Sequence, residues 1–231
     1  MTYPEIYYEM SDRNRQIIRE KGVKYDETLK NTAPDKRVGL AILALYESFE
    51  DENLTKLTNE VKTAFPSQIV YTQKPKGPLE ASIHFTFMQI FGVLSEEAGI
   101  SKINLDQYKP IISDSFKDLE PFEVVFKHVI AVPTGLVIAG YPSIDINIYR
   151  DNLRNLIKKS GLPFSEPYYT VAVHSNLLRL CCDESADKIL AFANKYKEIE
   201  LGKLQVSKFI FGFGTWKVLP NEINMPYTIS L

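Results

Sequence analysis

Two pairs of polar residues stand within apolar stretches of the sequence. His84 and Thr86 lie in the run IHFTF, and His174 and Asn176 lie in the run VHSNL. Both stretches are predicted to be β-strands, in which residues i and i+2 share a face and lie about 7 Å apart. We therefore expect each histidine to share a strand face with a side chain that can donate a hydrogen bond.

Two such pairs facing each other across a cleft would form a compact four-residue site. An imidazole titrates near neutral pH, so one ring can hold a proton while the other lacks one. One histidine would remove a proton from water, and the other would protonate the departing oxygen of a phosphodiester. The hydroxyl of Thr86 and the amide of Asn176 would donate hydrogen bonds to the non-bridging phosphate oxygens.

The third histidine of the chain, His128, provides an internal comparison. It lies in a similar apolar run, VFKHVIAV, but its i+2 neighbour is Ile130. A single histidine in an apolar strand is more often a core residue than a catalyst, and no second copy of this arrangement exists. We interpret His128 as structural, whereas the repetition of the other two pairs favours a functional site.

The runs IHFTF and VHSNLLR resemble the paired motifs of the two-histidine (2H) phosphoesterase superfamily, which includes LigT-like RNA ligases and cyclic phosphodiesterases. The resemblance spans about residues 36–218. It implies an α+β, bilobal, pseudo-two-fold fold, in which two antiparallel sheets line a central cleft and helices lie outside. It also implies cleavage of 2′,3′-cyclic phosphates or 2′–5′ linkages at small nucleotides or RNA ends without a metal or cofactor.

The resemblance assigns catalytic roles to His84 and His174, and phosphate-binding roles to Thr86 and Asn176. The second motif departs from the family pattern at two positions. Asn176 stands where the family has Ser or Thr, and Ser175 stands where it has a hydrophobic residue. Because asparagine can still donate to a phosphate oxygen, we expect Asn176 to affect catalytic efficiency more than the fold.

Three further residues could contact the substrate. Tyr169 and Trp216 could stack on a base, although core packing is an equal alternative for each. Arg179 could contact phosphate, but strand alternation predicts that it lies on the face opposite His174 unless the strand bends.

The hydrophobic pattern divides the chain into an extension and one domain. Residues 1–35 are expected to form a partly helical extension. Residues 36–231 are expected to form a single domain with lobes over about 36–143 and 144–231, with strands that could exchange between them. Short apolar runs bounded by glycine, proline or charged residues predict strands over 36–47, 81–91, 122–143 (a hairpin turning at Pro133-Thr134-Gly135), 169–180 and 203–218. Apolar residues at helical spacing predict helices over 51–66, 95–121 (in two pieces around Pro110), 145–161 (ending at Gly161) and 183–198 (starting at Asp183).

Composition narrows the classes of partner and location. The 231 residues carry a net charge of −2, so a broad basic groove for duplex nucleic acid is not expected. The two cysteines, Cys181 and Cys182, are adjacent and form no zinc-binding pattern, so no metal site is expected. No run is long enough to span a bilayer, and the N-terminus lacks the layout of a signal peptide, which favours a cytoplasmic protein without a membrane partner.

Three hypotheses follow for the function. The first is a metal-independent phosphodiesterase (hydrolase) that uses the two histidines as general acid and base. The second is a non-catalytic nucleotide or RNA-end binding module with a degenerate second motif, which Asn176 suggests. The third is a structural or interaction protein whose histidines belong to the core.

Overall fold

The structure is a computed structural model of the chain, and it describes residues 2–30, 37–45, 52–94, 103–215 and 224–231. The helices are α1 (Tyr3–Lys21), α2 (Glu52–Ala64), α3 (Lys109–Phe116), α4 (Asn147–Ser160) and α5 (Ala186–Lys195), with short 3₁₀ turns η1 (Glu27–Lys30) and η4 (Leu105–Gln107). The strands are β1 (Val38–Leu45), β2 (Ile69–Thr72), β3 (Glu80–Ser82), β4 (His84–Leu94), β5 (Phe122–Val132), β6 (Gly135–Pro142), β7 (His174–Arg179), β8 (Glu200–Val206), β9 (Lys208–Gly214) and β10 (Asn224–Ser230).

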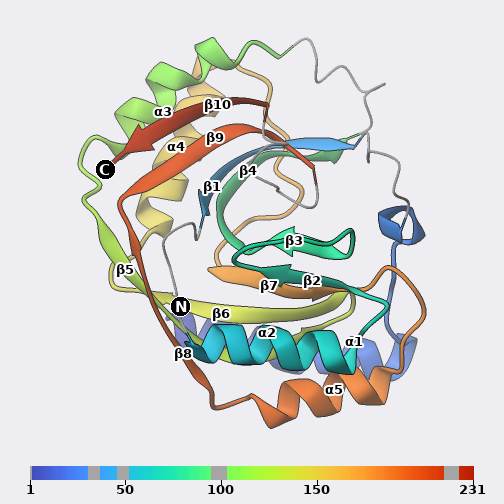
Figure 1. The fold of residues 1–231 in the computed structure, drawn as a ribbon. Coiled ribbons are helices and arrows are strands. Elements are labelled where there is room, and N and C mark those ends of the chain that lie inside the picture. Colours follow the sequence, from blue (N-terminus) through green and yellow to red (C-terminus); the bar gives the residue numbers. More distant parts are fainter. Residues whose placement is uncertain (1, 31–36, 46–51, 95–102, 216–223) are drawn as a thin grey trace.

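The strands form two sheets, one of four strands and one of six (Figure 1). The orders are β10-β9-β1-β4 and β3-β2-β7-β6-β5-β8. All pairings are antiparallel except that of β2 with β3, which is parallel. The predicted α+β class is therefore confirmed, with one parallel pair added to the expected antiparallel sheets.

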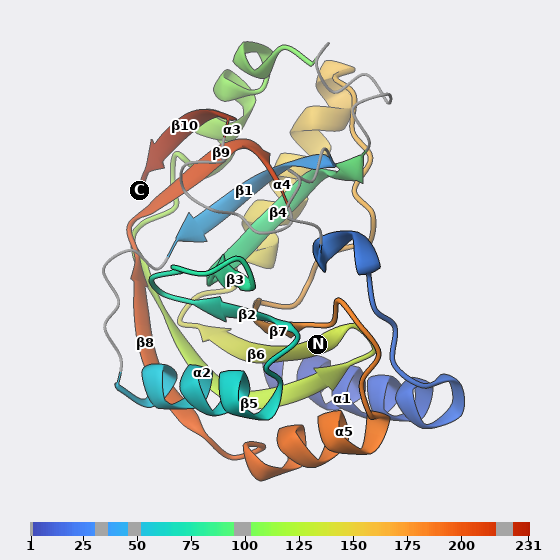
Figure 2. The ribbon, with the colours of Figure 1, turned by 45° about the vertical axis from the view of Figure 1, so that its right-hand side comes forward.

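The two sheets repeat one arrangement around the histidine-bearing strands. In each sheet, three antiparallel strands (β10-β9-β1 or β8-β5-β6) lead to the histidine strand, β4 or β7. A helix precedes that strand in both cases, α2 between β1 and β4 and α4 between β6 and β7. Strands β2 and β3 extend the second sheet beyond β7. Each sheet takes strands from both sides of residue 143, and β4 contacts β7 where the sheets meet (Figure 2).

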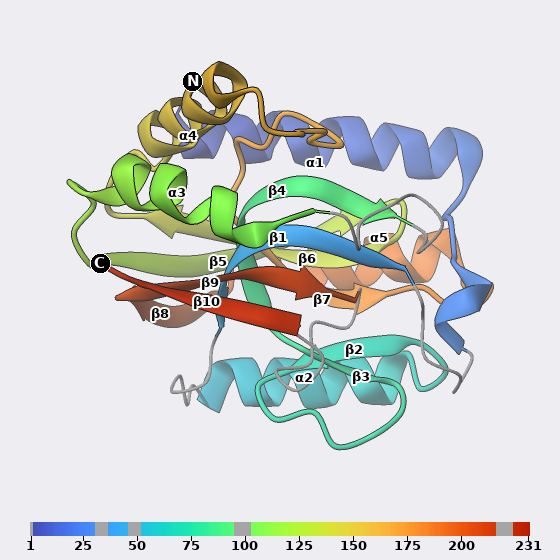
Figure 3. The same cartoon turned by 90° about the horizontal axis from the view of Figure 1, so that it is seen from above.

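The helices lie outside the sheets, with α1 and α2 on opposite sides of the molecule (Figure 3). Helix α2 packs on β2 and β8, and α4 packs beside α3 next to the four-stranded sheet. In α2 Leu54, Leu57 and Val61 recur at helical spacing and are all buried, as an apolar stripe of helical period requires. Burying these stripes against both sheets produces one continuous core.

Several local predictions are confirmed and others need correction. Gly161 ends α4 in the left-handed conformation (φ 72°), which a glycine adopts without the strain of a Cβ. Strands β5 and β6 form the predicted hairpin. Helix α5 starts one turn later than predicted, because Ser185, not Asp183, accepts the hydrogen bond from the Lys188 amide. Pro110 lies in the first turn of α3, where its missing amide hydrogen costs nothing, and the 3₁₀ turn η4 precedes this helix.

The sequence pattern missed three strands. Strands β2 and β3 are only four and three residues long, too short for a clear alternation. Strand β10 lies beyond the predicted end of the last sheet segment. The predicted helical residues 95–102 lie outside the described part of the chain.

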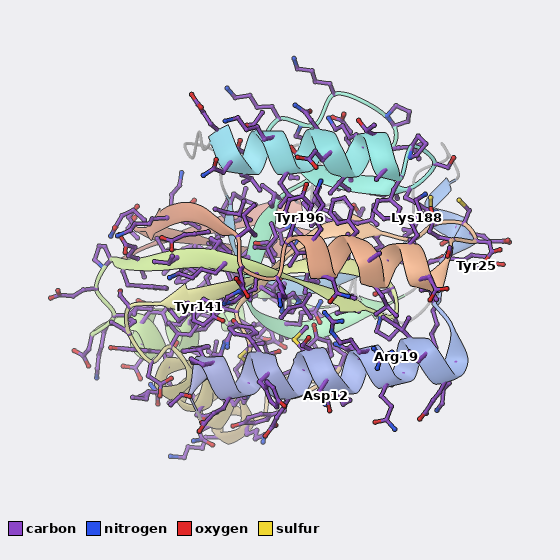
Figure 4. All side chains as sticks on the ribbon, turned by 90° about the horizontal axis from the view of Figure 1, so that it is seen from below. Asp12, Arg19, Tyr25, Tyr141, Lys188 and Tyr196 are labelled. Atoms are coloured by element: carbon purple, nitrogen blue, oxygen red, sulfur yellow. The ribbon has the colours of Figure 1, made fainter. Side chains whose placement is uncertain are left out.

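The N-terminal extension contains a long docked helix. Helix α1 packs on β5 and lies alongside α5, and Figure 4 shows Asp12 and Arg19 along it, seen from below. Helix α5 is in turn tied to α2, because Glu60 accepts hydrogen bonds from Lys195 Nζ (2.6 Å) and from the hydroxyl of Tyr196. Helix α1 packs on Ile130, Val137 and Ala139 of the six-stranded sheet, whereas the buried residues of α2 and α5 belong to the main core.

The structure also describes the two cysteines and the length and apolar character of the helices. Both cysteines are free thiols, and both Sγ atoms donate to the carbonyl oxygen of Ser67. Across the described segments, none of the helices combines the length and apolar character that crossing a bilayer would require.

Candidate active site

The first motif occupies the start of β4. His84 lies opposite Leu45 of β1, and Thr86 lies opposite Leu43. Leu45 packs against Leu43 on one face of the sheet, whereas Phe85 is fully buried in the main core on the other face. Because side chains opposite each other in an antiparallel pair share a face, His84 and Thr86 stand together on the face away from the main core.

A bulge follows Thr86 directly. Leu43 pairs with Thr86, but the next β1 residue, Ile42, pairs with Met88, so Phe87 is the extra residue. Gln89 then pairs with Ala41 and joins the face of His84 and Thr86. Gln89 is half-buried, like Thr86, whereas Phe87 and Met88 are fully buried. Strict alternation would have placed Gln89 on the core face.

The second motif occupies β7 in the same manner. His174 lies opposite Ala139 of β6, and Asn176 lies opposite Val137. Leu136 then pairs with Leu178, so Leu177 is the extra residue of a second bulge. This bulge corrects the expectation for Arg179, which pairs with Gly135 and therefore shares a face with His174 and Asn176.

Tyr71 of β2 connects the two motifs. Its ring lies against the imidazole of His84, with ring centroids 6.0 Å apart. Its hydroxyl forms hydrogen bonds with Arg179 and Asn176; burial raises the pKa of Tyr71, and the Arg179 charge and these hydrogen bonds oppose the rise. Sequence reasoning missed Tyr71, because the short strand that carries it gave no alternating pattern.

The imidazole of His84 has a fixed tautomer in its neutral form. Nδ1 lies 2.9 Å from the carbonyl oxygen of Ser82, and since a carbonyl can only accept, Nδ1 carries the hydrogen. Nε2 is then the nitrogen that exchanges a proton in either catalytic role. Burial lowers the pKa of His84, and the hydrogen bond to Ser82 partly offsets this shift.

His174 has a still more depressed pKa. Burial, the positive charge of Arg150 and the proximity of His84 together lower the pKa of His174 to about 4. Its Nδ1 is buried, and it has no hydrogen-bond partner among the described residues. Both imidazoles are therefore neutral at pH 7 when the site is empty. Binding an anion would favour their protonation.

Arg150 of α4 joins the backbones of the two motifs. Its side chain is fully buried, and its Nε donates to the carbonyl of the bulge residue Phe87 at 2.7 Å. Further bonds go to the carbonyls of Val171 (2.9 Å) and Ala172 (3.1 Å), which lead into β7. Burial lowers the pKa of Arg150 to about 10, so it stays cationic at neutral pH. Its guanidinium supplies hydrogen-bond donors to these backbone carbonyls.

Tyr7 of α1 packs against Val137 and Ala139 and supports the backbone of the second motif. Its hydroxyl accepts a hydrogen bond from the Val173 amide at 3.0 Å and lies 2.6 Å from the Gly140 carbonyl. Val173 immediately precedes His174. The N-terminal helix therefore fixes the backbone at the point where β7 begins.

The remaining sequence candidates lie in different surroundings. Tyr169 is exposed; its hydroxyl donates to Asp151 at 2.5 Å, and its ring lies under Arg154, so it contacts α4. Trp216 lies outside the described residues. The neighbouring Tyr168 is also exposed.

His128 lies at a bulge of β5, with a φ of 57°. Its Nδ1 donates to the carbonyl of Lys197 at 2.6 Å, and its ring packs edge-on against Tyr141. These contacts hold the β5 backbone to the turn after α5, which agrees with the structural role predicted for this histidine.

The described residues include no group of three or more His, Cys, Asp or Glu side chains that could together hold a metal ion. The groups that converge at the motifs are imidazoles, neutral hydrogen-bond donors and one guanidinium. These groups are suited to proton transfer and to binding an anion.

The sequence matches no family model and no curated protein. The fold is similar to the structure of Kluyveromyces marxianus Usb1 with uridine monophosphate, with a TM-score of 0.49 and 10% identity, covering 85% of this chain and 99% of that chain. It is also similar to a crystal structure described as a phosphoesterase, with a TM-score of 0.43 and 14% identity, covering 85% and 96%.

A third similar structure is E. coli LigT complexed with ATP, with a TM-score of 0.39 and 14% identity, covering 85% of this chain and 95% of that chain. All these scores lie below 0.5, so the chemistry of the site is derived from its own residues.

Proposed function

We propose that the protein is a metal-independent phosphodiesterase acting on a small nucleotide or RNA end with a 2′,3′-cyclic phosphate or a 2′–5′ linkage. One observation carries the proposal. Two histidine strands from different sheets meet, and each presents a histidine and a hydrogen-bond donor on one face with the same register. A lone core histidine gives no reason for such a repeat.

The chemistry needs one proton acceptor and one proton donor. For a cyclic phosphate, water attacks phosphorus while one imidazole takes its proton. The bond from phosphorus to the 2′ or 3′ oxygen breaks, and the other imidazole protonates that oxygen to give a phosphomonoester. Nε2 of His84 serves in either role, because Nδ1 is engaged with Ser82.

Three side chains would bind the phosphate in this mechanism. Thr86 and Asn176 donate hydrogen bonds to the non-bridging oxygens, and Arg179 supplies positive charge on the same face as Asn176. Tyr71 holds Asn176 and Arg179 through its hydroxyl, so their donors are oriented before substrate arrives. Such preorganisation is the usual source of electrostatic stabilisation in a transition state.

A second candidate function is binding of a nucleotide or RNA end without turnover. It rests on Asn176, which stands where the resemblance expects Ser or Thr. In this case phosphate would bind at the same donors, and no product would form. A product assay separates the two functions, because only the first predicts conversion of a cyclic phosphate to a monoester.

The test measures hydrolysis of adenosine 2′,3′-cyclic phosphate and of a 2′–5′ dinucleotide in excess EDTA. We expect wild-type turnover, and a fall of about 10² to 10⁴-fold for His84→Gln and for His174→Gln, the usual worth of a positioned acid or base. The double variant should be little worse than the weaker single variant, because residues that act as a unit are not additive.

His128→Gln is the matched control, since His128 lies in a strand of the same molecule but contacts Lys197 and Tyr141. It should keep nearly full activity. Circular dichroism and melting curves check that every variant is folded. Activity that is lost in folded His128→Gln and retained in His84→Gln would contradict the proposal, whereas nucleotide binding without product would establish the second function.

A further inference from the structure

The two bulges create a third matched position that the motifs alone do not reveal. On β4 the residues facing the site are His84, Thr86 and Gln89, at positions 0, +2 and +5. On β7 the residues facing the site are His174, Asn176 and Arg179, at the same positions. The extra residue is the fourth of each motif, Phe87 or Leu177. Gln89 is therefore the structural counterpart of Arg179.

The surroundings of the two +5 residues also correspond. Each lies opposite a small residue in the neighbouring strand, Ala41 for Gln89 and Gly135 for Arg179. Both are half-buried, while the two residues preceding each are buried. Small residues opposite leave space for a long side chain to extend over the sheet face toward the preceding donor.

The formation of the first bulge explains how Gln89 reaches this face. The carbonyl of Phe87 turns out of the sheet ladder and accepts from Nε of the buried Arg150 at 2.7 Å. Without the bulge, Gln89 would point into the phenylalanine-rich core, where its amide would be costly to bury. The position of Gln89 is therefore maintained by a specific contact.

We infer that Gln89 is a substrate-binding residue that recognises a neutral group of the substrate, on the opposite side of the phosphate from Arg179. The inference rests on the proposed function. Arg179 can only donate and carries a charge, whereas a glutamine amide donates and accepts without charge. The site would thus bind an asymmetric ligand, with phosphate charge toward Arg179 and a ribose hydroxyl or base edge toward Gln89.

The first test compares Gln89→Ala with Gln205→Ala, a control glutamine on the exposed face of β8. For adenosine 2′,3′-cyclic phosphate we expect Gln89→Ala to raise KM about 3- to 10-fold with little change in kcat, the worth of one neutral hydrogen bond. Gln205→Ala should leave both unchanged. An effect that persists on base-free ribose 2′,3′-cyclic phosphate assigns the contact to the ribose, and one that vanishes assigns it to the base.

The second test exchanges the residues at the two +5 positions and measures binding of inorganic phosphate by calorimetry. Arg179→Gln should weaken binding about 10- to 100-fold, as expected for a charged hydrogen bond. Adding Gln89→Arg should restore most of this loss, because the +5 positions are equivalent. Lack of recovery, or unchanged KM in Gln89→Ala, would overturn the inference while wild-type turnover keeps the proposed function. Absence of both phosphate binding and turnover in the wild type would overturn the two together.

Discussion

The two histidines of the site are held by different means. His84 donates from Nδ1 to Ser82 and packs against Tyr71, whereas Nδ1 of His174 is buried without a partner among the described residues. Burial lowers the pKa of both, and Arg150 lowers that of His174 further. A phosphate anion between them would reverse these shifts, because it favours the protonated rings.

These pKa shifts predict an acidic optimum for kcat/KM. Acid–base catalysis by two histidines needs one protonated ring and one neutral ring in the free enzyme. Both pKa values lie below about 6.5, and that of His174 is about 4, so we expect a bell-shaped profile centred between these values. Initial rates from pH 3.5 to 9 would measure it, and an optimum above pH 7.5 would contradict the assignment.

The same shifts set the sign of the stability change with pH. As pH falls through about 6.5, the unfolded chain protonates His174 first, so the free energy of unfolding decreases until about pH 4. The loss for His174 is about 3 kcal/mol. Urea unfolding of wild type and His174→Gln at pH 7 and pH 4.5 should show a smaller pH dependence in the variant, and an equal dependence would contradict this account.

At the scale of elements, the bulges are what sequence reasoning could not supply. The strand period correctly placed His84 with Thr86 and His174 with Asn176, because two residues are too few for a bulge to intervene. After the bulge at the fourth residue of the motif, strict strand alternation no longer holds, so it assigned Arg179 to the wrong face. A bulge depends on a hydrogen-bond partner from a distant part of the chain, which for β4 is Arg150. The local alternation of polar and apolar residues does not indicate such a partner.

Replacing Arg150 tests the contact between α4 and the two motifs. Arg150→Met removes the bonds to the carbonyls of Phe87, Val171 and Ala172, so we expect kcat to fall about 10- to 100-fold with a smaller change in KM. The pKa of His174 should rise, because the charge of Arg150 lowers it. Histidine NMR titration measures this rise, which a purely structural role would not produce.

The matched control is Arg154→Met, one turn further along α4. Arg154 is also buried, but it pairs with Glu166 and Asp151 and donates to the carbonyl of Thr170, not to those of Phe87, Val171 or Ala172. This variant should lose stability and keep the pKa of His174. If both variants shift that pKa equally, Arg150 has no special position.

Replacing Tyr7 tests the contact between α1 and the second motif. Tyr7→Phe keeps the ring but leaves the buried amide of Val173 without its acceptor, which typically costs about 1–3 kcal/mol. For a chain of this size the melting temperature should fall by about 2–10 °C. Tyr8→Phe, at an exposed position on the same helix, should melt like the wild type; equal melting of all three proteins would show that the α1 contact is not needed.

At the scale of the molecule, the repeated strand–helix–strand order was readable from the sequence, and the sheet partners were not. The histidine-bearing strands, the helices before them and the hairpin at Pro133 follow from local pattern and turn residues. The joining of β9 and β10 to β1, and of β2 to β7, depends on contacts between distant segments. Tyr71 entered the site through such a pairing, so no local motif could identify it.

The same architecture explains how two separate motifs can form one site. Each histidine strand is the fourth in an equivalent antiparallel set, and β4 contacts β7 where the two sheets meet. Arg150 and Tyr71 cross that junction from α4 and β2. The central claim is therefore that His84 and His174 act on one phosphate.

The most direct test is a ¹⁵N NMR titration of the three histidines with and without adenosine 3′-monophosphate. We predict that ligand shifts the imidazole resonances of His84 and His174 together and raises both pKa values from their depressed positions, while the imidazole resonances of His128 do not move. A ligand that binds without changing either buried histidine, or that changes only His128, would contradict the claim.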